Sequence, residues 1–311
     1  MPALQRAGAV ALAGLLTALP GTPLSASPAP LAQRRLATPA FDSSRAFEDV
    51  RQLVAIGPRP AGSPGGVQAR AYISKQLEAA GLKPHEQAFT ASTPFGPVKM
   101  ANVIAAIPGA SRQRIVLGGH YDTKLFRQFR FVGANDGGSS TAMLLELARV
   151  LAKRKGTFTI ELVFFDGEEA MLPDWSGTDN TYGSRHYVEE AKRTGTLKDV
   201  RAMLLVDMVG DRDLNIRRES HSSNWLTEIV WASARALGHG AHFVDESEPI
   251  EDDHVNFLKA GVPSVDLIDL DYRAWHTPDD TVDRVSARSL QVVGEVVLHA
   301  LPRIEKRLED Q

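Results

Sequence analysis

Acidic and imidazole side chains stand directly after several hydrophobic runs of this sequence. His120 follows the run RIVLGG, and Asp207 ends the run AMLLV. Glu168 and Glu169 follow the run LVFFDG, and a last run, SVDLIDL, leads to His276. Side chains of these types bind metal ions and transfer protons.

The adjacent pair Glu168 and Glu169 indicates which of these chemistries to expect. A single acidic residue after a strand is commonly a helix cap or a turn residue. Two neighbouring carboxylates repel each other, however, unless a cation offsets their charge. Zinc fits that need, because it accepts histidine nitrogen and carboxylate oxygen in a four-coordinate site with one position open for substrate. The sequence has no cysteine, so any metal must be held by His, Asp and Glu.

The hydrophobic runs also indicate the elements that position these side chains. They are rich in Ile, Val, Leu and Phe without two-fold alternation, which is typical of strands buried on both faces. The expected strands are 102–107, 114–119, 158–165, 202–209 and 264–270. The expected helices are 43–55, 66–80, 140–153, 183–192, 225–237 and 286–308.

Strands that alternate with helices predict an α/β fold with three α/β/α layers around a central, mostly parallel mixed sheet. In such sheets the polar residues that do chemistry gather beyond the carboxyl ends of the strands. The polar residues after the runs are therefore expected to share one edge of the sheet.

The composition is that of a globular protein, with 311 residues of which 43% are hydrophobic. We expect a single zinc-dependent catalytic domain at 41–311. The formal net charge is -3, and the basic residues are spread along the chain instead of forming a stripe that could neutralise phosphates. Nucleic acid is not an expected partner.

The first forty residues have a different character. Arg6 precedes an apolar stretch at 7–19, which is followed by GTPLSASPAP. This pattern predicts a signal peptide at 1–26 and a Pro/Ala-rich leader at 27–40. The apolar stretch is shorter than the roughly 20 residues that span a bilayer. We expect an exported protein, periplasmic or secreted, without stable membrane insertion after the signal is removed.

Six sequence motifs resemble those of a known family. They are GGHYDTK, FVGANDGGSSTAMLLELAR, FFDGEEA, TYGSRHY, EDDHVNFL and AWHTPDD. They occur in the same order in animal-type glutaminyl cyclases, the glutaminyl-peptide cyclotransferases of the zinc aminopeptidase-like superfamily (peptidase family M28). The resemblance covers roughly 51–303 and implies the zinc aminopeptidase-like fold.

The resemblance also implies roles for individual residues. Asp136, Glu169 and His276 would hold one zinc ion per chain. Glu168 would be the proton shuttle of the reaction, and Asp207 would form a carboxylate network beside it together with Asp252.

The resemblance further implies a substrate pocket and a second metal position. Trp175 and Trp275 would be the apolar walls of the pocket, and Glu251 would contact substrate at a position where animal cyclases commonly have Gln. In dizinc relatives, His120 and Asp207 would hold a second metal, which Asp136 would bridge to the first.

Three functions remain open at this point. The favoured one is cyclisation of N-terminal glutamine in a peptide or protein by a monomeric enzyme that uses one zinc. The second is a co-catalytic dizinc aminopeptidase, since all five dizinc ligand positions are filled and the GGSS stretch resembles the aminopeptidase loop. The third is a non-catalytic binding domain, which would be expected to lack ligands that this chain keeps. The two tryptophans and Asp252 favour the cyclase.

Overall fold

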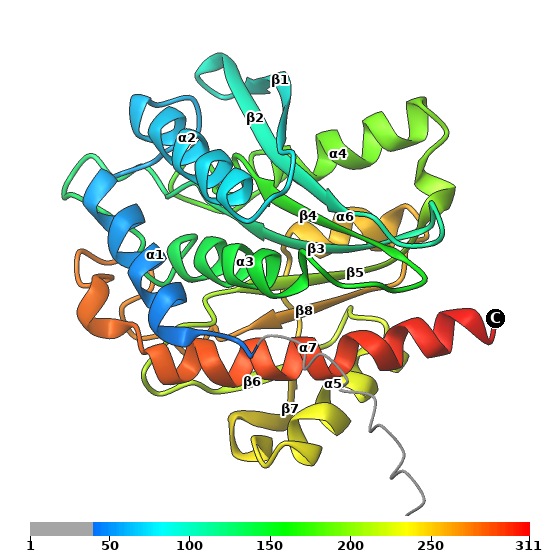
Figure 1. Ribbon diagram of the computed structural model, residues 1–311. Coiled ribbons are helices and arrows are strands. Elements are labelled where there is room, and N and C mark those ends of the chain that lie inside the picture. The colour runs from blue at the N-terminus through cyan, green and yellow to red at the C-terminus, as the bar shows by residue number, and fades with distance from the viewer. Residues whose placement is uncertain (1–39) are drawn as a thin grey trace, which may run out of the picture. The chain divides into compact units, whose positions relative to one another are not determined.

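The computed structural model describes residues 40–311 and contains a six-stranded sheet in the order β1-β2-β4-β3-β5-β8 (Figure 1). Strands β4, β3, β5 and β8 run parallel to one another. Strand β2 runs antiparallel to both of its neighbours, β1 and β4. The strands are β1 His85–Thr93, β2 Gly96–Ile107, β3 Arg114–His120, β4 Thr159–Phe165, β5 Val200–Asp207 and β8 Ser264–Ile268. A separate ribbon pairs β6 Ile216–Glu219 with β7 Phe243–Glu248. The predicted fold class is confirmed.

Several helices begin where the sequence offers a capping side chain. Asp42 accepts a hydrogen bond at the start of α1, and Ser63 does so before Pro64 of α2, which satisfies amide groups that a helix start leaves free. The helices are α1 Ser43–Ile56, α2 Pro64–Ala79, α3 Gly138–Leu151, α4 Tyr182–Arg193, α5 Asn224–Ala236, α6 Asp253–Lys259 and α7 Ala287–Glu309. Short 3₁₀ turns lie at Leu197–Asp199, Gly240–His242 and Val282–Arg284.

Helices cover both faces of the sheet and create two cores. The larger core packs α1, α2, α3, α5 and α7 against one face, and the smaller packs α4 and α6 against the other. Consecutive strand residues enter different cores: Leu117 and Leu204 join the larger one, and Val116 and Leu205 join the smaller one. The central strands β3, β4, β5 and β8 therefore have no polar face, which explains their nearly uninterrupted apolar sequence.

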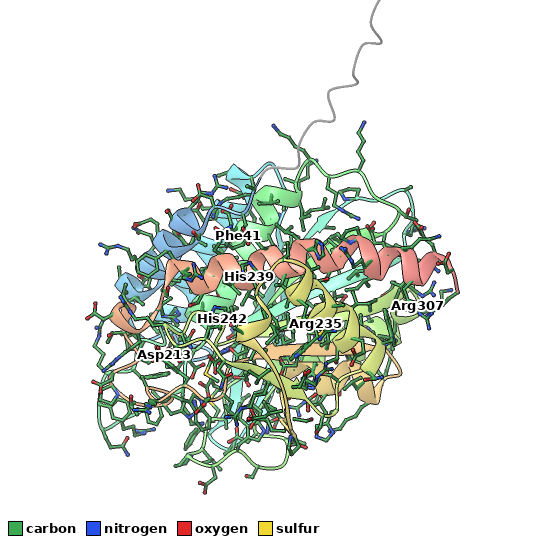
Figure 2. All side chains as sticks on the ribbon, turned by 90° about the horizontal axis from the view of Figure 1, so that it is seen from below. Phe41, Asp213, Arg235, His239, His242 and Arg307 are labelled. Atoms are coloured by element: carbon green, nitrogen blue, oxygen red, sulfur yellow. The ribbon has the colours of Figure 1, made fainter. Side chains whose placement is uncertain are left out.

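Seen from below, α7 and α5 form the outer surface of the larger core (Figure 2). Phe41 lies so close to α7 that a Cβ added to Gly294 would fall 2.4 Å from its ring. His239, just after α5, lies 2.8 Å from Glu295 of α7. The helical glycine therefore permits close packing of the first described residues against the last helix.

The structure adds elements that the sequence pattern did not predict: β1, β6, β7 and α6. β1 is a partly exposed edge strand, so it lacks the continuous apolar run of the central strands. The predicted end of β5 at 209 was wrong, because Met208 takes a φ of 46° and ends the strand at Asp207. β8 likewise ends at Ile268 instead of 270.

Two expectations from the sequence lie at or beyond the limit of the described residues. The predicted signal peptide at 1–26 and all but the last residue of the predicted leader lie outside them and stay predictions. Within 40–311, no helix has both the length and the apolar character needed to cross a membrane.

Candidate metal centre and active site

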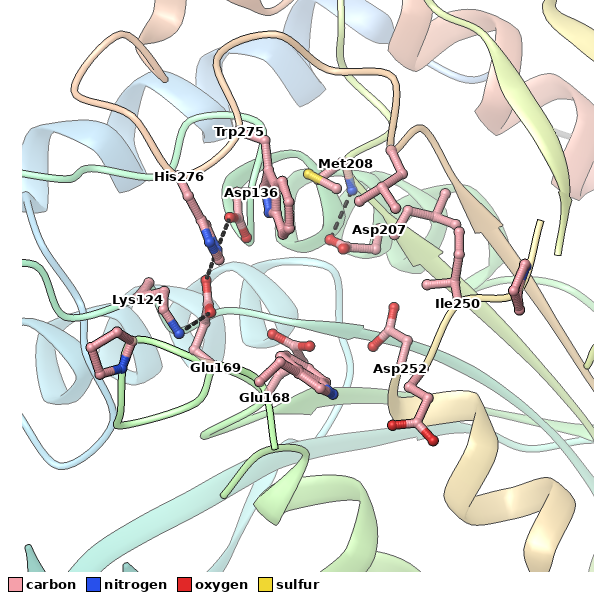
Figure 3. Close-up of a pocket in the computed structure, with 16 residues that line it drawn as sticks. Lys124, Asp136, Glu168, Glu169, Asp207, Met208, Ile250, Asp252, Trp275 and His276 are labelled. Carbon is pink, nitrogen blue, oxygen red and sulfur yellow. Dashed lines mark hydrogen bonds and ion pairs between the residues drawn. The ribbon is translucent and has the colours of Figure 1, made fainter. Parts of the chain in front are cut away.

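The parallel strands bring the polar residues to one edge of the sheet, as predicted. His120 ends β3 beside Phe165, the last residue of β4, and Asp207 ends β5 beside Ile268, the last residue of β8. The loops that leave these ends carry the glutamate pair and His276. Asp207, the glutamate pair and His276 line a pocket of about 340 Å³ (Figure 3).

Asp136, Glu169 and His276 meet at one end of this pocket, with ligand atoms that all lie within 4.8 Å of one another. His276 Nε2 is 3.1 Å from Glu169 Oε1 and 3.3 Å from Asp136 Oδ2. Asp136 Oδ2 and Glu169 Oε2 are buried and accept no hydrogen bond. Unpartnered buried carboxylate oxygens are costly unless a cation binds them. One imidazole and two carboxylates form a donor set that suits zinc, so these residues fit the metal that the sequence predicts.

Neighbouring side chains hold His276 in place. Its backbone has a φ of 54°, a conformation that a residue other than glycine adopts only when its surroundings impose it. Trp275 stacks on the imidazole with ring centroids 4.4 Å apart, and Phe126 meets it edge-on at 5.6 Å. The aromatic contacts limit rotation of the imidazole ring.

The loop before α3 is held by groups to which the sequence pattern assigned no role. Asp280 accepts hydrogen bonds from the backbone N–H groups of Asn135, at 2.8 Å, and Asp136, at 3.2 Å. It also accepts one from the Tyr272 hydroxyl at 2.7 Å. The string AWHTPDD contains Asp280, but its pattern alone does not reveal this contact.

Two further residues that the sequence did not single out support the same loops. Arg59 is fully buried and donates to the backbone carbonyls of Val132, at 2.7 Å, and Gly133, at 2.9 Å. Asp122 accepts from the backbone N–H groups of Glu168 and Glu169, which fixes the direction of the pair. The position of Asp122 directly after a strand could have indicated a role at the site, whereas nothing in the sequence indicates that Arg59 is buried.

His120, Asp136 and Asp207 form a second group whose ligand atoms lie within 4.8 Å of one another. His120 Nε2 is 3.0 Å from Asp207 Oδ1 and 3.3 Å from Asp136 Oδ1. Asp207 Oδ1 also accepts hydrogen bonds from the Ser140 hydroxyl at 3.0 Å and the Met208 N–H at 2.8 Å. The half-site for a second metal is therefore assembled, but protein donors already occupy one of its oxygens.

Glu168 and Asp252 also line the pocket: Glu168 lies beside Glu169, and Asp252 lies farther from His276 (Figure 3). Both are buried, with 6% and 4% of their surfaces exposed. Burial, together with the charges of Asp252 and Glu169, raises the pKa of Glu168 well above its ordinary value. Burial, together with the charges of Asp207 and Asp253, does the same for Asp252. Carboxyl groups in such an environment can hold a proton at neutral pH.

The remaining predicted residues also line the pocket. Trp175, Trp275 and Glu251 do so together with the apolar side chains of Ile250 and Met208. The structure thus brings all the residues of the sequence prediction to one pocket, with His120 just beneath its lining.

Known proteins resemble this chain in sequence and in fold. Residues 102–301 match peptidase family M28. The glutaminyl-peptide cyclotransferase-like protein of Bos taurus is 33% identical over 271 residues, which cover 75% of this chain and 68% of the relative.

Solved structures show the same similarity. A glutaminyl cyclase from an Acidobacteriales bacterium superposes with a TM-score of 0.83 at 40% identity, over 91% of this chain and all of the other. A structure described as a leucine aminopeptidase precursor from Bacteroides thetaiotaomicron gives 0.78 at 28% identity, over 85% of this chain and 97% of the other. The chain therefore belongs to peptidase family M28 and, within it, to the glutaminyl-peptide cyclotransferases.

Proposed function

We propose that this protein is a zinc-dependent acyltransferase that converts the N-terminal glutamine of peptides or proteins to pyroglutamate and releases ammonia. The observation that carries the proposal is the pocket itself, where a donor group for one metal lies beside the buried carboxyl of Glu168. Asp136, Glu169 and His276 would hold the zinc. Bound there, zinc would act as a Lewis acid toward the side-chain amide of the substrate.

The side chains of the protein supply proton transfer and positioning. In the reaction, the α-amino nitrogen of the substrate forms a bond to its own side-chain carbonyl carbon, and the carbon–nitrogen bond of the amide breaks. Glu168 takes a proton from the attacking amine and gives it to the departing nitrogen, which leaves as ammonia. Asp207 and Asp252 hold the amine close to that carbonyl, and an intramolecular attack needs no activated water.

The walls of the pocket suit a glutamine side chain. Trp175, Trp275 and Ile250 provide apolar surface in the same pocket as the carboxylates. Such walls exclude bulk water and strengthen the few polar contacts that orient a ligand. This favours cyclisation over hydrolysis, which requires a water molecule at the same place.

The second metal group keeps the dizinc aminopeptidase as the competing proposal. His120, Asp136 and Asp207 are assembled, but the hydrogen bonds from Ser140 and Met208 to Asp207 favour a single zinc. We further propose that the enzyme is a monomer. The sequence of the first 26 residues supports the additional proposal that it is exported from the cell.

Metal analysis combined with two assays on the purified protein tests the proposal. One zinc per chain is expected, with ammonia release from a Gln-initiated dipeptide and no amino acid release from a Leu-initiated one. Two zinc ions per chain, with free leucine as the only product, would identify an aminopeptidase and overturn the cyclase proposal.

A further inference from the structure

The mouth of the pocket carries a single charged side chain. Of the residues that line the pocket, those exposed to solvent are Pro173, Pro249, Glu251 and Trp275. Glu251 is the charged member of this group, and the other carboxylates of the lining are buried. A substrate that leaves the pocket therefore passes three apolar side chains and one carboxylate.

Protein groups do not neutralise this carboxylate. Its chain neighbours Ile250 and Asp252 both make hydrogen bonds, whereas the Glu251 side chain has no hydrogen-bond or ion-pair partner within residues 40–311. The lysine of the lining, Lys124, is buried, donates to the Ala170 carbonyl at 3.0 Å and lies 3.7 Å from Glu169. The charge of Lys124 therefore faces Glu169 and not Glu251, so the charge of Glu251 is available to a ligand.

The backbone around Glu251 is fixed. On one side, the N–H of Ile250 donates to Glu219, which in turn lies 3.0 Å from the imidazole of buried His254. On the other side, Asp252 caps α6. Figure 3 shows Ile250 and Asp252 on the wall of the pocket. Because both neighbours are anchored, the Glu251 side chain extends from a preorganised position.

The proposed reaction determines which part of a substrate reaches this mouth. The glutamine side chain must enter the buried end, so the residue that follows it in the peptide lies near the exposed rim. Arginine and lysine combine an apolar stem with a terminal cation. Their stems match the two prolines and Trp275, which is 44% exposed, and a guanidinium group also stacks on indole rings.

We propose that Glu251 selects substrates in which a basic residue, arginine or lysine, directly follows the N-terminal glutamine. This inference rests on the proposed cyclase function and specifies its substrate class. An ion pair at a solvent-exposed mouth is worth a factor of about 2 to 5 in kcat/KM, because water and salt screen it.

The test uses three peptides that differ only at the second position: Gln-Arg, Gln-citrulline and Gln-Glu peptides. Citrulline keeps the size and shape of arginine without its charge. The wild-type enzyme should prefer arginine to citrulline by about 2 to 5-fold, mainly through KM, and should disfavour glutamate by a similar factor. Raising the ionic strength to about 0.5 M should reduce both preferences.

Substitutions at the rim then assign the preference to one residue. Glu251→Gln should bring the arginine to citrulline ratio to about 1, and Glu251→Lys should place glutamate above arginine. The matched control is Asp174→Asn, which removes an exposed carboxylate of the neighbouring loop that does not line the pocket. This control should keep the wild-type ratio.

Two negative outcomes are distinguishable. Ammonia release from all three peptides, with the same arginine to citrulline ratio in wild type and Glu251→Gln, would overturn the role of Glu251 and leave the cyclase proposal standing. No ammonia from any peptide with the zinc-loaded wild type would overturn both.

Discussion

At the metal end of the pocket, the carboxylates of Asp136 and Glu169 face His276 and Lys124. Farther along the site, burial is the main influence on Glu168, Asp252 and Asp253 and raises the pKa of each, although the charge of His120, which lies 3.7 Å from Glu168, partly offsets the rise. Burial alone would raise the pKa of Asp136, but its contacts with His120 and His276 lower the pKa below its ordinary value. Burial raises the pKa of Asp253 to about 7.

The difference shows how one fold obtains two kinds of carboxylate in one site. Asp136, which contacts two imidazoles, has a lowered pKa and can bind a metal cation, whereas burial and the charge of Asp136 raise the pKa of Glu169 despite its contact with His276. A carboxylate buried among other carboxylates favours its protonated form and can exchange a proton with a substrate. Glu168 and Glu169 are adjacent in the chain, yet they contact different imidazoles: Glu169 lies 3.1 Å from His276, and Glu168 lies 3.7 Å from His120.

Replacing each glutamate by its amide should separate the two ends with the largest effect. Glu168→Gln should keep zinc but lose about 10³-fold in kcat, because it removes the group that accepts and returns the proton. Glu169→Gln should lose zinc itself, since it replaces a ligand carboxylate by a neutral amide. Metal content measured on the purified variants, together with ammonia release, checks both. Zinc loss in Glu168→Gln with retention in Glu169→Gln would show that the two roles are exchanged.

The sequence predicts the glutamate pair and the other strand-end residues because their signal is local. A buried strand is a continuous apolar run, and the residue that follows it must lie at the sheet edge. The motifs then distinguish Glu168 from Glu169 by resemblance, which the apolar pattern alone cannot do.

The roles of the residues that support the site could not be predicted from the sequence, because they depend on contacts between distant segments. Arg59 lies in a Pro- and Gly-rich connector and reaches carbonyls more than 70 positions later in the chain. Asp280 is one of two adjacent aspartates, and only the fold shows that it contacts Asn135 while Asp279 faces solvent. β1 was missed for a similar reason, since its pairing with β2 defines it and its own sequence is largely polar.

The Asp280 contacts provide a second test, confined to the metal end. Asp280→Asn places an amide group beside two backbone N–H donors and should weaken zinc binding by about 10 to 100-fold, as expected when the partner of a ligand loop is lost. Asp279→Asn is the matched control, because the Asp279 side chain is 71% exposed. Competition with a chromophoric chelator measures both affinities. Equal affinities would show that Asp280 does not organise the metal ligands.

The smallest expected effect concerns the stability of the carboxylate end. An acid whose pKa is about 7 in the folded protein and 3.8 in the unfolded chain contributes fully to stability below pH 3.8 and loses that contribution as the pH rises to 7. Asp253→Asn cannot ionise, and its amide oxygen can still accept the hydrogen bond that Ser184 donates to Asp253. The variant should therefore be more stable than wild type at pH 8, where the wild-type carboxyl must ionise in a buried position, and nearly equally stable at pH 4.

Urea unfolding from pH 4 to pH 8 measures this difference, with Asp174→Asn as the exposed control that should show none. The direction of the change is what distinguishes the two ends of the pocket. Raising the pH strengthens a metal site, because its ligands must be deprotonated, whereas it destabilises a group of buried carboxyls with raised pKa values, because they must ionise. A constant difference between Asp253→Asn and wild type across this range would mean that Asp253 is ionised like an ordinary surface aspartate. The two ends would then not differ in the way their charges are balanced.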